Sequence, residues 1–280
     1  MPGLLRSDRG GLSVSSPLGE RKDACGLRKW PFQHNNWKMA EDMLSRYRGE
    51  YNRVLIVVEG VYSMDGDIAP IPELIEIKKK YKALLMIDEA HSMGTMGSRG
   101  GGMRDYFNLN PADVDVWMGT LSKSFGAAGG YISGSSDLIT YLRYTAPGFV
   151  FSAGITPPNA AAALAALRLL KKEPQRVAKL HHNADRFLAK AKSFHLNTGT
   201  SGGTPVVPII LGNSVHALKL SNAMFKRGIN VQPIMYPAVE ESAARLRFFI
   251  TSDHTDEDLD YTIDVMVDEL RKIDPGYVRA

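Results

Sequence analysis

The chain has 280 residues, of which 44% are hydrophobic and 23% charged, enough apolar material for one large domain or two smaller ones. The net charge is +4 and the basic residues are scattered, so the sequence predicts no nucleic-acid surface. A single cysteine, Cys25, excludes an internal disulfide, and no apolar run approaches the ~18 residues of a membrane-spanning helix. We therefore expect a cytoplasmic protein that reaches a membrane only through a partner, if at all.

Glycine, serine, arginine and lysine are frequent in residues 1–30, where no hydrophobic period is sustained. This composition predicts a flexible lead-in. Arg6, Arg9 and several serines leave a transit peptide open, although Asp8 and the lack of an apolar helix face argue against one.

Helical and strand-like patterns alternate along the next part of the chain, which predicts an α/β fold with a mostly parallel sheet. One unbroken apolar run, residues 83–87, is typical of a strand buried on both faces. We expect helices at residues 38–48, 71–81, 157–170 and 174–194, and strands at residues 53–59, 83–87, 114–118 and 131–132.

The pattern changes from Thr204 onward. We expect strands at residues 206–211, 229–232 and 245–250, alternating with helices at 214–227 and 256–272. Residues 253–255 suit the cap of the last helix. The expected organisation is a lead-in over residues 1–30, a larger domain over 31–172 and a small α/β domain over 173–280.

The segment GTLSKSFGAAGG, residues 119–130, places Lys123 between hydroxyl residues, after an apolar run and before a glycine cluster. A lysine that forms an imine must present a partly desolvated amine as the nucleophile. Neighbouring hydroxyls and backbone N–H groups could hold a phosphate, and glycines let the backbone approach a ligand. Alone, the segment fits an exposed loop lysine beside a glycine turn equally well.

A second segment favours the functional interpretation. The apolar run at residues 83–87 ends in Asp88, Glu89, Ala90 and His91. A carboxylate and an imidazole at the carboxyl end of such a strand lie where open α/β sheets bind ligands.

Three further patterns predict no site. DEAH also occurs in helicases, but a helicase needs a G-x-x-x-x-G-K-[ST] loop, which the sequence lacks. The glycines within residues 94–102 form no dinucleotide fingerprint. His181 and His182 are adjacent on a predicted helix and would point about 100° apart, so we expect no metal site there.

Five phrases resemble, in family order, the α-oxoamine synthases, which are pyridoxal-phosphate (PLP) enzymes of fold type I. The phrases are EGVYSMDGDIAP (59–70), DEAHSMGTMGSRGGG (88–102), GTLSKSFGAAGGYISG (119–134), FSAGITPP (151–158) and ARLRFFITSDHT (244–255). The resemblance implies a large PLP-binding domain with a mostly parallel sheet and a small C-terminal α/β domain. Family members carry a long segment before the part that resembles residue 32 onward, so we expect the large domain here to be incomplete and the chain truncated at its N-terminus.

The resemblance implies three catalytic residues. Lys123 would form the imine with PLP and move protons at the substrate Cα. Asp88 would pair with the pyridine nitrogen and keep it protonated, so that the ring accepts electrons. His91 would hydrogen-bond the phenolic oxygen of PLP.

Further binding residues follow from the same resemblance. Thr120 and Ser122 would contact the phosphate, and Ser63 would lie near the phenolic oxygen. Ser152 matches a residue that reaches the phosphate of the partner subunit. Arg247 matches the residue that holds the carboxylate of the amino acid, a task suited to a planar guanidinium.

The implied reaction is a Claisen-type, usually decarboxylating condensation of an amino acid with an acyl thioester of coenzyme A or acyl carrier protein. The nearest branch is serine palmitoyltransferase, which would place the chain in sphingolipid biosynthesis. The alternatives are an amino-oxononanoate-synthase-like or other class II aminotransferase-type enzyme. A non-catalytic remnant or accessory subunit stays open because of the expected truncation. The implied assembly is a homodimer or heterodimer, without nucleic acid.

Overall fold

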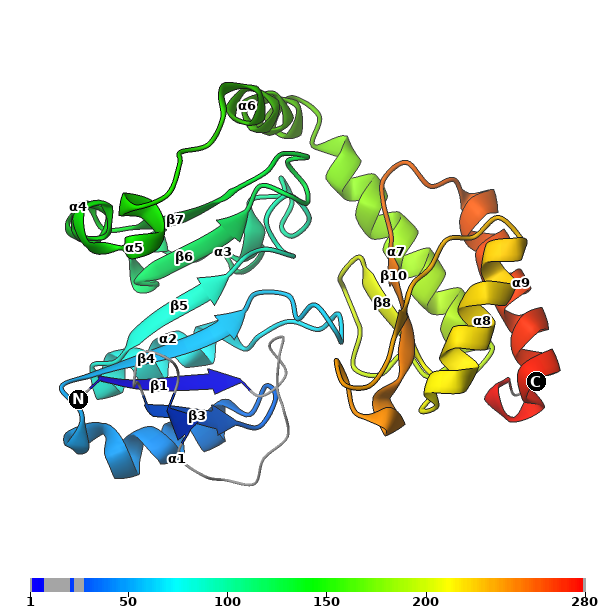
Figure 1. The fold of residues 1–280 in the computed structure, drawn as a ribbon, viewed down its shortest axis with the longest axis horizontal. Coiled ribbons are helices and arrows are strands. Elements are labelled where there is room, and N and C mark those ends of the chain that lie inside the picture. Colours follow the sequence, from blue (N-terminus) through cyan, green and yellow to red (C-terminus); the bar gives the residue numbers. More distant parts are fainter. Residues whose placement is uncertain (1, 8–20, 23–27, 279–280) are drawn as a thin grey trace. The chain divides into compact units, whose positions relative to one another are not determined.

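The computed structural model describes residues 2–7, 21–22 and 28–278 (Figure 1). These residues form two units, each with its own sheet. Unit 1 holds the described residues up to residue 61 together with Ala69–Pro174, and unit 2 holds Tyr62–Ile68 and residues 175–278. Across the described ranges, no helix combines the length and apolar character of a membrane span.

In the part of the chain that the structure describes, unit 1 contains a seven-stranded sheet of order β2-β3-β1-β4-β5-β6-β7 (Figure 1). Its central strands are parallel, and β2 and β7 pair antiparallel at the two edges, so the expected mostly parallel sheet is confirmed. The strands are β1 Pro2–Ser7, β2 Arg21–Lys22, β3 Arg28–Phe32, β4 Arg53–Glu59, β5 Leu84–Asp88, β6 Val116–Thr120 and β7 Gly130–Gly134.

The expectation of a lead-in outside the fold is wrong for the described residues before residue 31. β1 lies between β3 and β4 and pairs parallel with both. Its partner residues are at least 25 positions away along the chain, as in the pair of Gly3 and Arg28, so the local composition could not reveal the pairing. The rest of the expected lead-in falls outside the described residues.

The helices of unit 1 follow their sequence signals. α2 begins with a proline in its first turn and ends where Lys82 adopts a left-handed conformation, with φ of 50°. Its buried residues Ile71, Leu74 and Ile75 follow helical spacing. The helices are α1 Trp37–Tyr47, α2 Ile71–Tyr81, α3 Gly102–Phe107, α4 Ser136–Thr145, α5 Pro147–Val150 and α6 Pro157–Lys172.

The sheet of unit 1 is buried mainly on one face. Leu85 and Ile87 of β5 are fully buried, whereas Leu84 is 40% exposed. The same alternation holds in β4 and β6. The expectation that residues 83–87 are buried on both faces is therefore wrong: α2 packs against β5, but Leu84, on the opposite face from Leu85, stays partly exposed.

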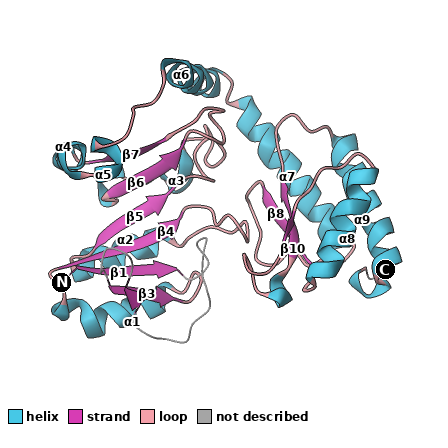
Figure 2. Cartoon of the chain, in the orientation of Figure 1, coloured by secondary structure: helices cyan, strands magenta, loops and turns pink. Residues whose placement is uncertain are grey.

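Unit 2 is a three-stranded antiparallel sheet of order β8-β10-β9, with helices α7, α8 and α9 packed on it (Figure 2). Its core joins Phe187 of α7 to Leu246 and Phe248 of β10. The elements are β8 Val206–Ile210, β9 Pro233–Ile234, β10 Arg245–Phe249, α7 Gln175–Ser193, α8 Ser214–Lys226 and α9 Asp256–Ile273.

Two sequence expectations about unit 2 have different outcomes. Thr255 caps α9 in a reciprocal capping box with Asp258, as the polar residues before that helix predict. The strand expected at residues 229–232 is wrong, because β9 begins only at Pro233. Val231 is buried there, and its carbonyl accepts a hydrogen bond from Ser221 of α8 at 2.7 Å.

Candidate active site

The lysine loop, residues 121–129, connects β6 to β7 and is closed by its own backbone. Leu121 N donates to Gly129 O at 2.9 Å, and Ala127 N donates to Leu121 O at 2.8 Å. Phe125 and Ala127 are buried and anchor the loop to unit 1, whereas Lys123 is exposed. The loop is therefore a fixed turn that presents an accessible amine.

Two hydroxyl groups lie together at the start of the lysine loop. Thr120 Oγ1 and Ser122 Oγ are 2.8 Å apart. Ser122 N donates to Thr120 Oγ1 at 3.2 Å. Both are at the carboxyl end of β6, so hydroxyl donors for an anion stand beside the amine of the loop.

Asp88 is the last residue of β5 and is half-buried. It pairs in register with Met118 of the parallel neighbour β6. One of its carboxylate oxygens, Oδ1, accepts a hydrogen bond from Ala90 N at 2.8 Å, which leaves the other oxygen for a second donor. Carboxyl ends of neighbouring parallel strands share one sheet edge, so Asp88 and His91 emerge at the same edge as the lysine loop.

The glycine loop, residues 92–102, is joined to the lysine loop by Ser124. Ser124 Oγ donates to Met93 O at 2.8 Å. Gly94 has φ of 85°, and a Cβ added there would overlap the Ser124 side chain. The motifs gave no reason to single out Ser124, because its partner lies 31 residues away.

Glu89 supports the other end of the glycine loop from inside the protein. It is 2% exposed, and its Oε1 accepts a hydrogen bond from Met103 N at 2.7 Å. Burial raises the pKa of Glu89 to about 7, and the charge of Asp88 adds to this. Burial likewise raises the pKa of Tyr131 to about 12, with smaller effects from Glu89 and Asp88. The DEAH phrase contains Glu89, and strand alternation could have indicated that it points to the opposite face from Asp88.

Ser152 lies between α5 and α6 in unit 1, on an exposed part of the chain. Its Oγ donates to Gly148 O at 2.5 Å. The side chains around it in the sequence are large, apolar and exposed: Tyr141, Tyr144, Phe149, Phe151 and Ile155.

Unit 2 brings the remaining two predicted residues together. Arg247 of β10 donates from Nη1 to Ser63 O at 2.8 Å. Its guanidinium carbon lies 4.7 Å from the centroid of the Phe249 ring. The contact reaches Ser63 because Tyr62–Ile68 belongs to unit 2, although it lies between β4 and α2 in the sequence.

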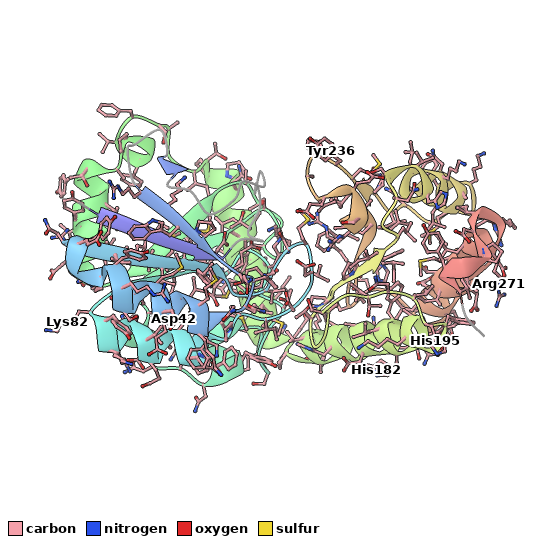
Figure 3. All side chains as sticks on the ribbon, turned by 90° about the horizontal axis from the view of Figure 1, so that it is seen from below. Asp42, Lys82, His182, His195, Tyr236 and Arg271 are labelled. Carbon is pink, nitrogen blue, oxygen red and sulfur yellow. The ribbon has the colours of Figure 1, made fainter. Side chains whose placement is uncertain are left out.

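Two histidines lie at α7 and its end. His182 on α7 is exposed and lies 3.7 Å from a carboxylate oxygen of Asp256, and His195 lies just beyond the same helix (Figure 3). Among the residues that the structure describes, no group of three or more His, Cys, Asp or Glu side chains could hold a metal ion.

Comparison with known proteins identifies the family of the chain. The model of the aminotransferase class I and II family matches residues 22–266. The 8-amino-7-oxononanoate synthase of Fervidobacterium nodosum is 41% identical over 239 residues, which cover 85% of this chain and 60% of that protein. Serine palmitoyltransferase 2 of Dictyostelium discoideum is 34% identical over 282 residues, covering 94% of this chain and 57% of that protein. The chain thus spans about 60% of the length of these curated relatives.

A comparison with solved structures also finds a serine palmitoyltransferase. Serine palmitoyltransferase from S. paucimobilis, with a bound PLP–myriocin aldimine, superposes with a TM-score of 0.88 at 26% identity. The match covers 97% of this chain and 67% of that one.

The donor set at the sheet edge of unit 1 fits PLP, which is the cofactor of this family. The set contains an amine, a carboxylate, an imidazole and two hydroxyls, which are groups of the kinds that bind an aldehyde, a pyridine nitrogen, a phenol and a phosphate. The relatives are an 8-amino-7-oxononanoate synthase and a serine palmitoyltransferase, and both enzymes are α-oxoamine synthases. The chain therefore belongs to the aminotransferase class I and II family and has the α/β architecture of PLP-dependent fold type I.

Proposed function

We propose that the chain acts as a PLP-dependent acyltransferase that condenses an amino acid with an acyl thioester to give an α-oxoamine. The observation that carries the proposal is the exposed Lys123 on an anchored loop at the same sheet edge as Asp88. The similarity to α-oxoamine synthases supplies the reaction class. When bound, PLP supplies the electron sink for chemistry at the Cα of the amino acid.

The residues of unit 1 divide the work at the cofactor. Lys123 Nζ would hold the cofactor through its aldehyde group and would move the proton at the Cα of the amino acid. Asp88 holds a proton on the pyridine nitrogen through a charge-assisted hydrogen bond. His91 orients the ring through the phenolic oxygen. Thr120 and Ser122 bind the phosphate with hydroxyl groups that already lie 2.8 Å apart.

Arg247 would bind the substrate carboxylate. The hydrogen bond to Ser63 O uses Nη1, and the Phe249 ring lies against the guanidinium. These contacts restrict a long side chain to one orientation before the substrate arrives, which lowers the entropy cost of binding. Ser63 is proposed as a cofactor contact near the phenolic oxygen through its hydroxyl group.

For the substrates, we favour an enzyme similar to serine palmitoyltransferase, with an amino-oxononanoate-synthase-like enzyme as the second candidate. The structural match to serine palmitoyltransferase supports the first, and the 41% identity to an 8-amino-7-oxononanoate synthase supports the second. A panel of small amino acids against acyl-CoA and acyl-carrier-protein thioesters of different chain length separates them. Release of free thiol with serine and a long-chain thioester supports the first candidate, and release only with another pair supports the second.

We also propose a dimer with shared active sites, formed with a second copy or a related chain. The support is the exposed apolar side chains that flank Ser152 in the sequence. Sedimentation of the full chain with PLP at micromolar concentration tests it. A single monomeric species would contradict the proposal.

The competing class is a non-catalytic remnant or accessory subunit. Purified chain with added PLP separates the two classes. A visible absorbance band that borohydride abolishes, with the pyridoxyl group mapped to Lys123, supports the enzyme. A remnant gives no such band, and label on another lysine would remove Lys123 from its proposed role.

A further inference from the structure

The segment Tyr62–Ile68 forms a tight turn that is fastened to unit 2. The turn is closed by Gly66 N donating to Tyr62 O at 2.8 Å and Tyr62 N donating to Asp67 O at 2.9 Å. Thr204 Oγ1 donates to Gly66 O at 2.7 Å. Gly66 has φ of 67°, and an added Cβ would overlap the Val206 carbonyl oxygen at the start of β8. The turn therefore lies directly on the sheet of unit 2 and requires glycine at residue 66.

A buried ion pair lies beneath this turn. Arg245 of β10 is 4% exposed and Asp65 is 2% exposed, and their Nη1 and Oδ1 atoms are 2.8 Å apart. Arg245 Nη1 also donates to Met64 O at 2.9 Å, and Arg245 Nε donates to Ala243 O at 2.8 Å. Buried ion pairs of this kind are often no more stabilising than apolar side chains of the same volume. The main consequence of these contacts is therefore that they fix the position of the turn, and their effect on stability is secondary.

The ion pair adjoins the proposed substrate-binding arginine. Arg245 and Arg247 are two residues apart on β10, so their side chains leave the same face of the sheet. Arg247 Nη1 donates to Ser63 O, and Arg245 Nη1 donates to the next carbonyl, Met64 O. Two consecutive carbonyl groups of the turn thus bind two arginines of the same strand face. The Met64 sulfur is 3.6 Å from Arg247 Nη1, on the same turn.

We propose that Asp65 and Arg245 are positioning residues for substrate recognition. The pair holds the turn so that the Ser63 carbonyl fixes the Arg247 guanidinium, and this sets the affinity for the amino-acid carboxylate. The proposal rests on the proposed function of Arg247. Arg245 touches no substrate in this scheme and acts only through Met64, Ser63 and Arg247.

The scheme predicts a specific kinetic pattern. Without the ion pair, Arg247 samples more orientations and must be ordered when the carboxylate binds. The cost falls on binding of the amino acid and not on the proton transfer at Cα. In the PLP-loaded full chain, Asp65→Asn should raise KM for the amino acid about tenfold while kcat changes less than about threefold, since tenfold corresponds to 1.4 kcal/mol. KM for the acyl thioester should stay unchanged.

A second variant guards against simple loss of folding. Asp65→Leu combined with Arg245→Met removes both charges at similar volume, so the fold should be kept. A purely structural ion pair predicts wild-type KM in this double variant. Our proposal predicts the same rise in KM as in Asp65→Asn, because the bond from Arg245 to Met64 O is also lost. Asp253→Asn, which removes an exposed carboxylate 3.6 Å from Arg176 in the same unit, is the matched control and should leave KM unchanged.

A readout that needs no catalysis accompanies the kinetics. Phenylglyoxal modifies accessible arginines, and peptide mapping of the full chain without PLP locates the label. We expect Arg247 to react several-fold faster in the double variant than in wild type. Equal rates together with unchanged KM would overturn the proposal. If Arg247→Lys itself leaves KM for the amino acid unchanged, the proposed function of Arg247 fails instead, so the two failures are distinguishable.

Discussion

The two units hold their candidate functional side chains in opposite ways. In unit 1, Lys123 is exposed on a loop that is fixed by backbone hydrogen bonds and two buried anchors. In unit 2, Arg247 is on a strand, beside a buried ion pair and against an aromatic ring. An amine that must change covalent partners needs access, whereas a guanidinium that binds a fixed carboxylate needs one orientation. The contacts that hold each side chain therefore differ in the way that the two proposed chemical roles require.

The largest expected effect removes the covalent chemistry of unit 1. Lys123→Ala should lower kcat by at least about a thousandfold, because both the covalent attachment and the proton transfer at Cα depend on the amine. Lys171→Ala removes an exposed lysine from the end of α6 in the same unit and should leave the rate unchanged. Arg247→Lys, in contrast, should act mainly on KM for the amino acid. Equal losses in kcat for Lys123→Ala and Arg247→Lys would remove the proposed contrast between the units.

The next effect concerns packing, where the two units should behave alike. Leu85 of β5 and Leu246 of β10 are both fully buried, so replacement by alanine should cost about 2–5 kcal/mol of unfolding free energy in each case. Leu84→Ala on the same strand should cost less than about 1 kcal/mol, because Leu84 is 40% exposed. Urea unfolding of the full chain measures all three. A loss at Leu84 as large as at Leu85 would show that both faces of β5 are packed after all.

A smaller effect concerns the response of unit 1 to pH. The pKa of Glu89 is raised by burial from 4.5 to about 7, so the folded chain binds this proton more tightly than the unfolded chain. The contribution of Glu89 to stability is therefore fully present below pH 4.5 and is lost as the pH rises to about 7. A shift of this size corresponds to roughly 3 kcal/mol.

Glu89→Gln should abolish this part of the pH dependence. The neutral amide keeps an acceptor for Met103 N, so the variant should be more stable than wild type at pH 8 and similar at pH 4.5. Urea unfolding at several pH values measures the difference between the two chains, which cancels the titration of all other groups. Glu73→Gln, at an exposed position in α2, serves as the control. An unchanged difference from pH 4.5 to 8 would contradict the raised pKa of Glu89.

Much of the fold could be predicted because local sequence patterns determine where its helices and strands begin and end. Helix α2 has the predicted bounds, 71–81, since a proline in the first turn and apolar residues at helical spacing define it without help from other elements. The mostly parallel character of the sheet could likewise be predicted from the alternation of helices and strands. β1, β2, β3 and β9 were not predicted. β1 and β3 depend on pairing with strands elsewhere in the chain, and β2 and β9 are only two residues long.

The same distinction between local patterns and distant contacts applies to the candidate site. Asp88 and Lys123 could be found from their position after apolar strands, and the structure places both at one sheet edge. Ser124 and Arg245 could not be found, because each acquires its role from a partner far away in the sequence. Arg245 meets Asp65 across 180 residues, and Ser124 meets Met93 across 31. Residue spacing carries no information about such contacts until the strands between them are in place.

The smallest expected effect tests how the lysine loop is supported. Gly94 and Gly126 both have positive φ, 85° and 57°, so alanine at either position has a backbone cost of about 1–2 kcal/mol. They differ in their surroundings, because a Cβ at residue 94 would overlap Ser124, whereas a Cβ at residue 126 would meet nothing within 4 Å. Gly94→Ala must therefore push the glycine loop away from the lysine loop and break the bond from Ser124 to Met93 O.

We expect Gly94→Ala to weaken PLP binding about tenfold and Gly126→Ala less than about threefold, although both should lose similar backbone stability. Equilibrium titration with PLP, followed by visible absorbance, measures both affinities. Ser124→Ala, which removes the hydroxyl without adding volume, should fall between them. If all three variants bind PLP as tightly as wild type, the lysine loop is fixed by its own backbone alone. The hydrogen bond from Ser124 to Met93 would then not be needed to position Lys123, in contrast to the ion pair that we propose positions Arg247 in unit 2.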